Sequence, residues 1–229
     1  MGKLRIISYN NEIFEDRREA GRLLAAEFGS YRGQNVVVLG IPRGGMVVAD
    51  EIAKELNVEL DIVISRKLRT PGQEELAMGS VAENGKVFLN ENIIRELGID
   101  EASIKREKEV QLVEIARRSA VIRKVKAKAD IKNRIAIVTD DGVATGATTQ
   151  AALWAVRQEK PLKLIAAIPV GAEDTIRRLA DEVDEIVCLR APSFFSAVGQ
   201  FYRFFGQVDD TEVLQILAER HNSGVVSSS

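Results

Sequence analysis

Two adjacent carboxylates and a run of small residues follow an apolar stretch in the second half of the chain. Residues 135–139 are apolar or β-branched, Asp140 and Asp141 come next, and the small residues of 142–149 follow. Backbone N–H groups at the start of a helix bind phosphate, and small residues let the phosphate come close. The two carboxylates cannot contact that phosphate favourably, but they can bind hydroxyls or a hydrated cation. A ligand with a phosphate at one end and a diol at the other, such as a ribose 5-phosphate, satisfies both parts.

A second loop offers a different phosphate ligand. The segment Gly40-Ile41-Pro42-Arg43-Gly44-Gly45 follows a short apolar run and precedes a helical pattern. Its glycines permit backbone conformations that other residues avoid, and Arg43 presents a fork of donors for phosphate oxygens. Alone, the segment also fits an ordinary strand-to-helix turn with a solvated arginine. Beside the acidic loop, phosphate binding by Arg43, Gly44 and Gly45 is the favoured interpretation.

Both loops lie at the ends of predicted strands in an alternating pattern of strands and helices. Short, continuous apolar strands separated by helices are typical of a parallel sheet covered on both faces. Ligands of such folds bind at the carboxyl ends of the strands. Strands are predicted over residues 35–39, 60–65, 79–83, 86–89, 134–139, 162–168 and 185–189, and helices over 14–28, 46–56, 91–97, 101–126, 145–158, 173–180 and 211–219.

The acidic loop resembles the phosphoribosyl-pyrophosphate (PRPP) motif of the type I phosphoribosyltransferases. The apolar strand, the acidic pair and the run Ala144-Thr145-Gly146-x-Thr148 match that motif in register. Thr139 and Gly142 depart from it, since aliphatic residues, or Ser at the second position, are usual there; neither change removes a ligand group. Across about residues 34–212 the chain most closely resembles an uncharacterised group of predicted phosphoribosyltransferases. That resemblance supports the fold and the use of PRPP without supplying the acceptor.

The resemblance implies roles for the acidic loop. Asp140 and Asp141 would bind the ribose 2- and 3-hydroxyls, directly or through water on Mg²⁺, which makes them the expected metal site as well. The 5-phosphate would lie against Ala144, Thr145, Gly146, Ala147 and Thr148. Hypoxanthine-guanine members carry a carboxylate at the position of Ala144 that assists the base. Alanine is more similar to the adenine, orotate and uracil members, so no catalytic base is expected there.

Two further segments acquire roles from the same resemblance. The loop containing Arg43 corresponds to the pyrophosphate loop. Arg66 and Lys67 are similar to an Arg-Lys pair of the adenine-using members, which implies that they bind the pyrophosphate. In those members the pair stands at the start of a mobile loop that covers the site, which implies a lid over residues 68–75 here. A basic surface turn is the alternative. Glu74 or Glu75 is a candidate for a substrate contact, and the sequence does not choose between them.

An aromatic cluster near the carboxyl terminus loosely resembles the base-binding hood of the 6-oxopurine members. Phe194 and Phe195 are candidates for stacking on a base, and Val198 for reading its edge through the backbone. The alternative is that these aromatic residues cover a sheet edge or form a dimer contact.

The resemblance implies a type I phosphoribosyltransferase fold, an α/β fold with a central, mostly parallel sheet flanked by helices and a small hood. We expect a helical N-terminal segment over residues 1–30 and a core over 31–190 with a helical insertion at 84–130. A hood and helix would follow over 191–220, and a disordered tail over 221–229.

Composition excludes several other classes. A single cysteine, Cys188, rules out an intrachain disulfide, and one cysteine with one histidine, His221, disfavours a structural zinc cluster. The net charge of −2 disfavours a globally basic nucleic-acid binder. Because the N-terminus lacks an apolar signal stretch and no apolar run is long enough to cross a bilayer, we expect a cytoplasmic protein without a membrane partner.

One basic run is a possible exception to the charge argument. Six cations fall between residues 115 and 129, namely Arg117, Arg118, Arg123, Lys124, Lys126 and Lys128. The run has almost no interleaved aromatics. A solvated helix face with a cationic carboxyl end is therefore favoured over RNA binding.

The sequence predicts a Mg²⁺-dependent phosphoribosyltransferase that uses PRPP and a small-molecule base, with a homodimer as the expected assembly. Asp140, Asp141, Arg66 and Lys67 would form its catalytic set. The alternative is a regulator that binds PRPP or a nucleotide and turns nothing over. The two hypotheses share the 5-phosphate loop and differ in whether a base pocket and a lid exist.

Overall fold

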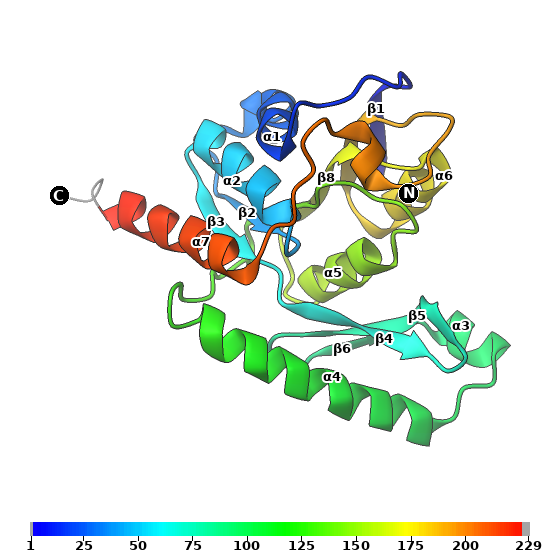
Figure 1. Cartoon of the computed structure of the whole chain (residues 1–229). Coiled ribbons are helices and arrows are strands. Elements are labelled where there is room, and N and C mark those ends of the chain that lie inside the picture. Colours follow the sequence, from blue (N-terminus) through cyan, green and yellow to red (C-terminus); the bar gives the residue numbers. More distant parts are fainter. Residues whose placement is uncertain (1, 226–229) are drawn as a thin grey trace.

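The computed structural model describes residues 2–225, apart from the side chains of Glu74, Glu75 and residues 221–225. Its main element is a sheet of six strands in the order β1-β9-β8-β7-β2-β3, in which all neighbours run parallel (Figure 1). This confirms the predicted α/β fold. The strands are β1 (Lys3–Ser8), β2 (Val36–Gly40), β3 (Glu59–Ile62), β7 (Ile135–Thr139), β8 (Lys163–Val170) and β9 (Glu185–Arg190).

Helices cover both faces of this sheet. One face packs on α1 (Arg17–Ala26) and α2 (Gly45–Leu56), and the other on α5 (Ala147–Arg157) and α6 (Glu173–Leu179). Residues of β2 alternate between the two cores, because successive side chains of a strand point to opposite faces: Val36 and Val38 belong to the first core, Val37 and Leu39 to the second. Burial on both faces explains why the central strands are continuous apolar runs.

The register of β2 and β7 brings the two predicted ligand loops together. Gly40, the last residue of β2, pairs with Thr139, the last residue of β7. The Ile41 N–H donates to the Thr139 carbonyl at 2.8 Å. The glycine loop and the acidic loop therefore leave adjacent strands at the same edge of the sheet.

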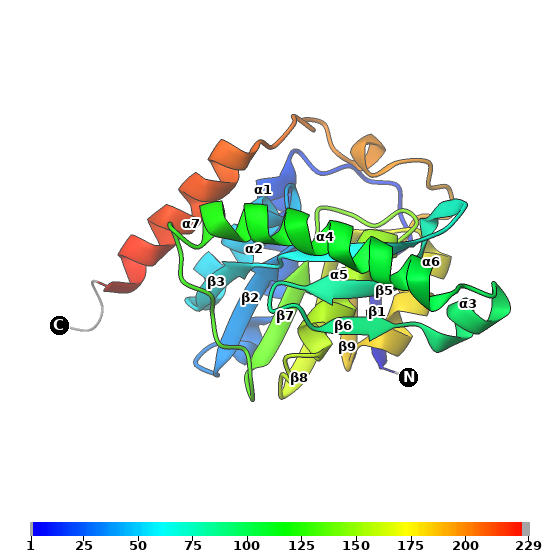
Figure 2. The same ribbon diagram turned by 90° about the horizontal axis from the view of Figure 1, so that it is seen from below.

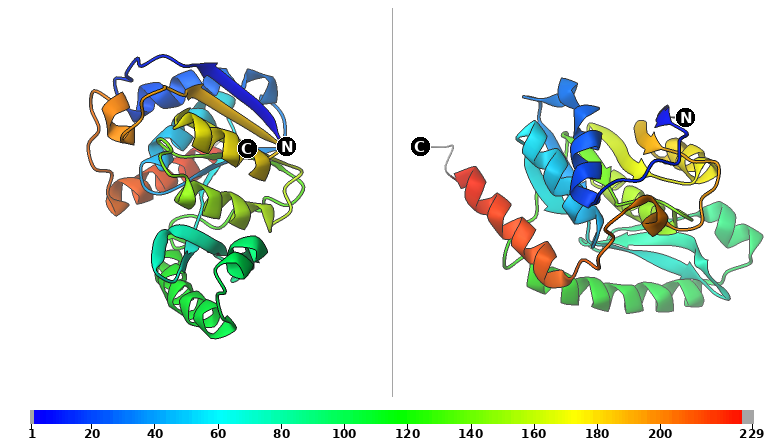
Figure 3. Two further views of the ribbon diagram at one scale, coloured as in Figure 1. Left: turned by 90° about the vertical axis from the view of Figure 1, so that its right-hand side faces the viewer. Right: turned by 45° about the horizontal axis from the view of Figure 1, so that its top comes forward.

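A second layer of structure lies against α5, outside the parallel sheet. It comprises β4 (Ser65–Thr70), β5 (Gln73–Ala82), β6 (Val87–Leu89), α3 (Glu91–Glu96) and α4 (Glu101–Ile122), and we call residues 65–122 the antiparallel module. The three strands pair antiparallel in the order β4-β5-β6. The small sheet lies between α5 and the long α4, below the core in Figure 1 and in the left view of Figure 3.

Residues 68–75, predicted as a loop that forms a mobile lid, lie in a hairpin instead, and their mobility stays a prediction. These residues belong to the hairpin of β4 and β5, which turns at Pro71 and Gly72. Gly72 adopts a φ of 73°, in the left-handed region that favours glycine. Leu68 is fully buried in the core, together with Met78 and Val81 of β5. The prediction weighed the many polar residues of this segment and overlooked Leu68, which faces the core.

Both ends of the chain also differ from the prediction. The segment predicted as helical over residues 1–30 begins with β1, which pairs with β9 from Lys3 opposite Glu185 onward. This edge strand is only partly buried and carries charged residues, so its apolar signal is weak. Helix α7 (Asp210–Val225) continues through five residues of the predicted disordered tail, and residues 226–229 lie outside the described part.

Short 3₁₀ helices lie at Gly29–Tyr31, Ala180–Glu182 and Val198–Phe201 in the described part of the chain. Within residues 2–225, none of the helices combines the length and apolar character needed to cross a membrane. Figure 2 shows α4 passing in front of the strands of the parallel sheet, with α7 extending away from the core.

Candidate active site

The acidic pair at the end of β7 is joined to the N-terminal helix. The Arg17 Nε donates to the Asp141 Oδ2 at 2.7 Å, and the two side chains are only 10% and 16% exposed. Arg17 also donates to the Gly206 carbonyl at 2.8 Å and lies 3.9 Å from the ring centre of Phe205. Sequence reasoning did not single out Arg17, which connects the acidic loop to the C-terminal segment (residues 191–209).

Asp140 has a different environment from Asp141. Its carboxylate accepts hydrogen bonds from the Asp141 N–H at 2.9 Å and the Thr149 hydroxyl at 3.4 Å. Burial, followed by the negative charge of Asp141, raises the pKa of Asp140 well above its usual range. Asp140 is therefore a carboxylate whose ionised form would be stabilised by a cation or by hydroxyl donors.

The predicted 5-phosphate loop leads into the N-terminus of α5. Gly146 precedes the helix with a φ of 80°, and no side chain caps the first turn. From α6, the Thr175 hydroxyl donates to the Ala144 carbonyl at 2.8 Å, and Arg178 donates to the Thr145 carbonyl at 2.6 Å. These bonds hold the loop by its carbonyl groups. The amides of the first turn are left to bind an anion.

The glycine loop packs directly against the acidic pair. A Cβ atom on Gly44 would overlap the Asp141 carboxylate, and one on Gly45 would lie 2.8 Å from the Cα of Asp140. The peptide bond between Pro42 and Arg43 is cis. Glycine at both positions is thus required for the two loops to approach each other this closely.

Most of the predicted polar site residues share one cleft or its neighbour. The cleft has a volume of about 740 Å³, and Arg43, Gly44, Arg66, Asp140 and Asp141 line it. An adjoining cavity of about 150 Å³ shares Arg66 with the cleft and is also lined by Lys67 and Thr148. Residues almost 100 positions apart in the sequence therefore converge on one surface.

The structure adds cleft residues that the sequence analysis assigned elsewhere. Arg117 and Arg118 of α4 line the cleft, although they were predicted to lie on a solvated helix face. Arg118 is only 24% exposed. It lies three residues after the buried Ile115 and four before the buried Ile122, on the side of α4 that packs on the rest of the molecule. That spacing was the sequence signal for an inward-facing arginine.

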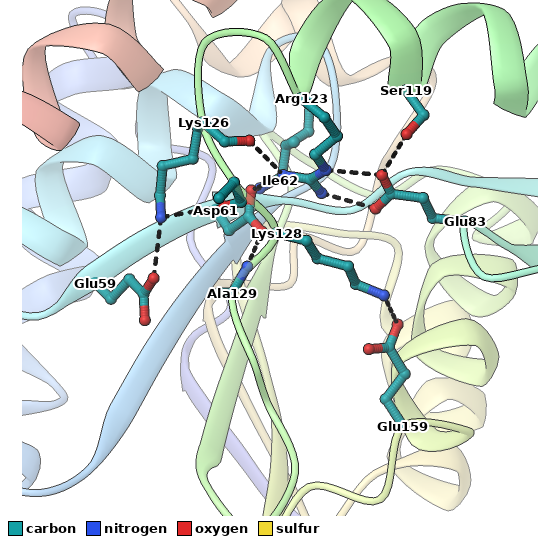
Figure 4. A network of polar contacts seen from close by, with 11 residues as sticks. Glu59, Asp61, Ile62, Glu83, Ser119, Arg123, Lys126, Lys128, Ala129 and Glu159 are labelled. Carbon is teal, nitrogen blue, oxygen red and sulfur yellow. Dashed lines mark hydrogen bonds and ion pairs between the residues drawn. The ribbon is translucent and has the colours of Figure 1, made fainter.

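Other members of the basic run are buried in a polar network (Figure 4). Arg123 donates to both carboxylate oxygens of Glu83, at 2.7 and 2.8 Å, and to Asp61 at 2.7 Å. Lys126 donates to Glu59 at 2.9 Å. Two members of the run therefore line the cleft and two lie at the junction of α4 with β3 and Glu83, whereas Lys124 and Lys128 are exposed. The prediction of one solvated face is wrong for part of the run.

The predicted base-binding residues do not line the cleft in the described part of the chain. Phe194 is 73% exposed, and the Phe195 ring lies 5.0 Å from that of Phe201. Val198 packs against Gly142, where a Cβ atom would be 2.5 Å from a Val198 methyl group. Phe205 is the aromatic residue of this segment that lines the cleft. Base binding by Phe194, Phe195 and Val198 stays a prediction.

Comparison with known proteins identifies the family. Residues 10–203 match the model of the phosphoribosyl transferase domain. Two proteins, from two strains of Mycobacterium tuberculosis, carry the provisional name phosphoribosyl transferase; each is 42% identical over 210 residues, which is 92% of this chain and 47% of the relative. The chain thus spans about half the length of these curated relatives.

A solved structure supports the same conclusion. The crystal structure of a protein from Thermus thermophilus is similar with a TM-score of 0.85 and 43% identity, covering 90% of this chain and 98% of that one. The domain match spans both the glycine loop and the acidic loop described above. The chain therefore belongs to the phosphoribosyl transferase domain family.

Proposed function

We propose that this protein transfers ribose 5-phosphate from PRPP to a nitrogenous base, a nucleobase by expectation, and releases pyrophosphate. The observation that carries the proposal is the convergence of an acidic pair and several arginines around one cleft, with the N-terminal turn of α5 at the adjoining cavity. These groups match the three parts of PRPP: the ribose hydroxyls, the 5-phosphate and the pyrophosphate.

In this proposal the chain acts mainly by holding and neutralising PRPP. The amides of residues 144–148 bind the 5-phosphate, and Asp140 and Asp141 bind the ribose hydroxyls. A ring nitrogen of the acceptor forms a bond to C1 while the bond from C1 to the pyrophosphate oxygen breaks. Pyrophosphate leaves with the electron pair, and the proton of the nitrogen passes to water. Arg43 and Arg66, on the wall of the cleft, stabilise the charge that develops on the leaving group.

The residues of the acidic loop fit a Mg²⁺ ion that substrate helps to hold. Within the described residues there is no cluster of three or more acidic, histidine or cysteine side chains that could bind a metal alone. Mg²⁺ keeps several waters and commonly uses one or two carboxylates together with substrate phosphates. Asp140 supplies a carboxylate of that kind, and Asp141 supplies another although it is paired with Arg17. When bound, the ion would neutralise negative charge on the pyrophosphate group.

The proposal is tested by incubating the protein with PRPP, Mg²⁺ and a panel of purine, pyrimidine and other nitrogenous bases. Release of pyrophosphate together with a nucleoside 5-monophosphate of the expected mass, with at least one base, supports it. The double variant Asp140→Asn, Asp141→Asn serves as the inactive control. Tight PRPP binding without turnover of any base would instead favour the regulator hypothesis, and no PRPP binding would contradict both.

A further inference from the structure

One carboxylate at the start of α7 is shared by two arginines of the cleft. The Arg43 Nε lies 3.1 Å from the Asp210 Oδ1, and an Arg118 Nη lies 3.6 Å from the same oxygen. Arg43 comes from the loop after β2, and Arg118 from α4 of the antiparallel module. Asp210 therefore brings two positive charges from distant segments to a single point on the wall of the cleft.

A second carboxylate binds two further arginines in the same way. Glu114 of α4 lies 3.5 Å from Arg66 and 3.3 Å from Arg117. The Arg66 Nε is buried and has no hydrogen-bond partner among the described residues. Four arginines are thus held by two carboxylates, which leaves an excess of positive charge and an unused donor at this end of the cleft. Such a set is complementary to a ligand with several negative charges.

We propose that Arg118 of α4 is a ligand for the pyrophosphate group of PRPP beside Arg43, and that Asp210 holds both arginines until PRPP displaces it. The inference rests on the proposed function. The Asp210 side chain is 68% exposed, and exposed ion pairs are weak. A phosphate group offers bidentate, charge-assisted hydrogen bonds to guanidinium groups, and these are much stronger. A polyphosphate should therefore displace the carboxylate.

The antiparallel module is fixed in a way that suits this role. Arg123, five residues after Arg118, is bonded to Glu83 and Asp61 in the buried network of Figure 4. This network attaches the carboxyl end of α4 to β3 of the core. Because the backbone at Arg118 is held about one turn away from that attachment, its guanidinium is presented to the cleft without a large rearrangement of the chain.

Two substitutions at this site should act in opposite directions. Arg118→Gln should weaken the binding of Mg²⁺-PRPP and of Mg²⁺-pyrophosphate by about 10- to 100-fold, since a hydrogen bond to a charged group is lost. Asp210→Asn should tighten both by about two- to fivefold, since a competing anion is removed. Ribose 5-phosphate, which lacks the pyrophosphate group, should bind all the variants equally. Isothermal titration calorimetry measures all three ligands.

Lys105→Gln is the matched control, since it removes one positive charge from an exposed position on the same helix. It should bind all three ligands like the parent. Circular dichroism and thermal unfolding establish that each variant is folded, and tighter binding by Asp210→Asn cannot arise from misfolding. An Arg118→Gln protein that binds PRPP as tightly as the parent would overturn the role of Arg118. An Asp210→Asn protein that gains no affinity would overturn the role of Asp210.

The outcomes separate this inference from the proposed function. If the parent binds PRPP and releases pyrophosphate while Arg118→Gln is unaffected, only the inference fails. If the parent binds neither PRPP nor pyrophosphate, the proposed function fails and the inference fails with it.

Discussion

Asp140 and Asp141 are neighbours in sequence but differ in electrostatic environment. Asp141 is paired with the nearly buried Arg17, whereas Asp140 is bonded to an amide and a hydroxyl and has a raised pKa because of burial and the charge of Asp141. From the sequence alone the two carboxylates form one equivalent pair that should tolerate neutralisation. The ion pair with Arg17 breaks this equivalence, because removing the charge of Asp141 leaves the buried Arg17 guanidinium without its counter-charge.

The two single asparagine variants should therefore differ in stability. Asp141→Asn should lower the free energy of unfolding by about 1–3 kcal/mol, because a hydrogen bond between two charged groups becomes one to a neutral acceptor. Asp140→Asn should leave the stability unchanged or raise it, since a partly buried charge is removed beside another of the same sign. Urea unfolding of the unliganded proteins measures both. Equal effects of the two substitutions would contradict the distinction.

Ligand binding should depend on both aspartates. The double variant Asp140→Asn, Asp141→Asn should bind PRPP at least about 100-fold more weakly, because two charge-assisted hydrogen bonds to the ribose are lost. Ribose 5-phosphate should still bind weakly through the amides of residues 144–148, which the substitutions leave in place. Titration of both ligands with Mg²⁺ present measures this, and an unchanged PRPP affinity would show that the acidic loop has been wrongly assigned.

At the scale of elements, the hairpin of β4 and β5 should behave as part of the core. Leu68→Ala should reduce the free energy of unfolding by about 2–5 kcal/mol, the usual cost of a large cavity in a packed core. Val113→Ala on α4 is the control, since Val113 is 68% exposed and its truncation should cost less than about 0.5 kcal/mol. Chemical unfolding measures both variants. Similar effects of the two would favour the hypothesis that residues 68–75 form a mobile lid.

The elements that the sequence predicts well are those whose signal is local. Strands β2 and β7 are continuous apolar runs, and α2 has clear helical spacing, so their predicted bounds agree closely with the structure. The edge strand β1 and the hairpin strand β4 contain charged residues among their apolar ones. Their composition is therefore not typical of a buried strand, and the sequence analysis did not predict them.

The same reasoning applies to the candidate site. The two ligand loops follow predicted strands, and their meeting follows from parallel pairing. The contact of Arg17 with Asp141 joins residues 124 positions apart and has no local signature. The sharing of Asp210 by Arg43 and Arg118 likewise depends on how α4 and α7 lie across the cleft, which no pattern within either helix specifies.

At the scale of the whole molecule, the junction between the antiparallel module and the core should depend on pH. Burial alone would raise the pKa of Glu83, but hydrogen bonds from Arg123 and Ser119 and the charge of Arg123 outweigh it and lower the pKa. A carboxyl with a lowered folded-state pKa contributes its full stability above its unfolded-state pKa, and loses that contribution as the pH falls through the folded-state value.

The parent should therefore lose stability between about pH 5 and pH 3 more steeply than Glu83→Gln, which lacks this titrating group. Glu109→Gln, at an exposed position on α4, should retain the slope of the parent. Free energies of unfolding measured across this pH range test whether Glu83 makes the parent more sensitive to acid. A Glu83→Gln protein with the same acid dependence as the parent would show that this junction does not contribute to it.

Binding of PRPP should also link the two parts of the molecule. The proposed ligands come from the core loops and from α4 of the antiparallel module, so occupancy should stabilise their relative arrangement. A ligand at about 100 times its dissociation constant stabilises the folded state by about 2.7 kcal/mol, which corresponds to about 100-fold slower exchange for amides that open only on global unfolding.

With Mg²⁺-PRPP, amide hydrogen exchange should slow both at residues 144–149 and along the carboxyl half of α4. In Arg118→Gln, at PRPP concentrations that give equal occupancy, the loop should keep its protection and α4 should lose part of it. Exchange in α4 that does not respond to PRPP in the parent, while the loop becomes protected, would show that the ligand is held by the core alone.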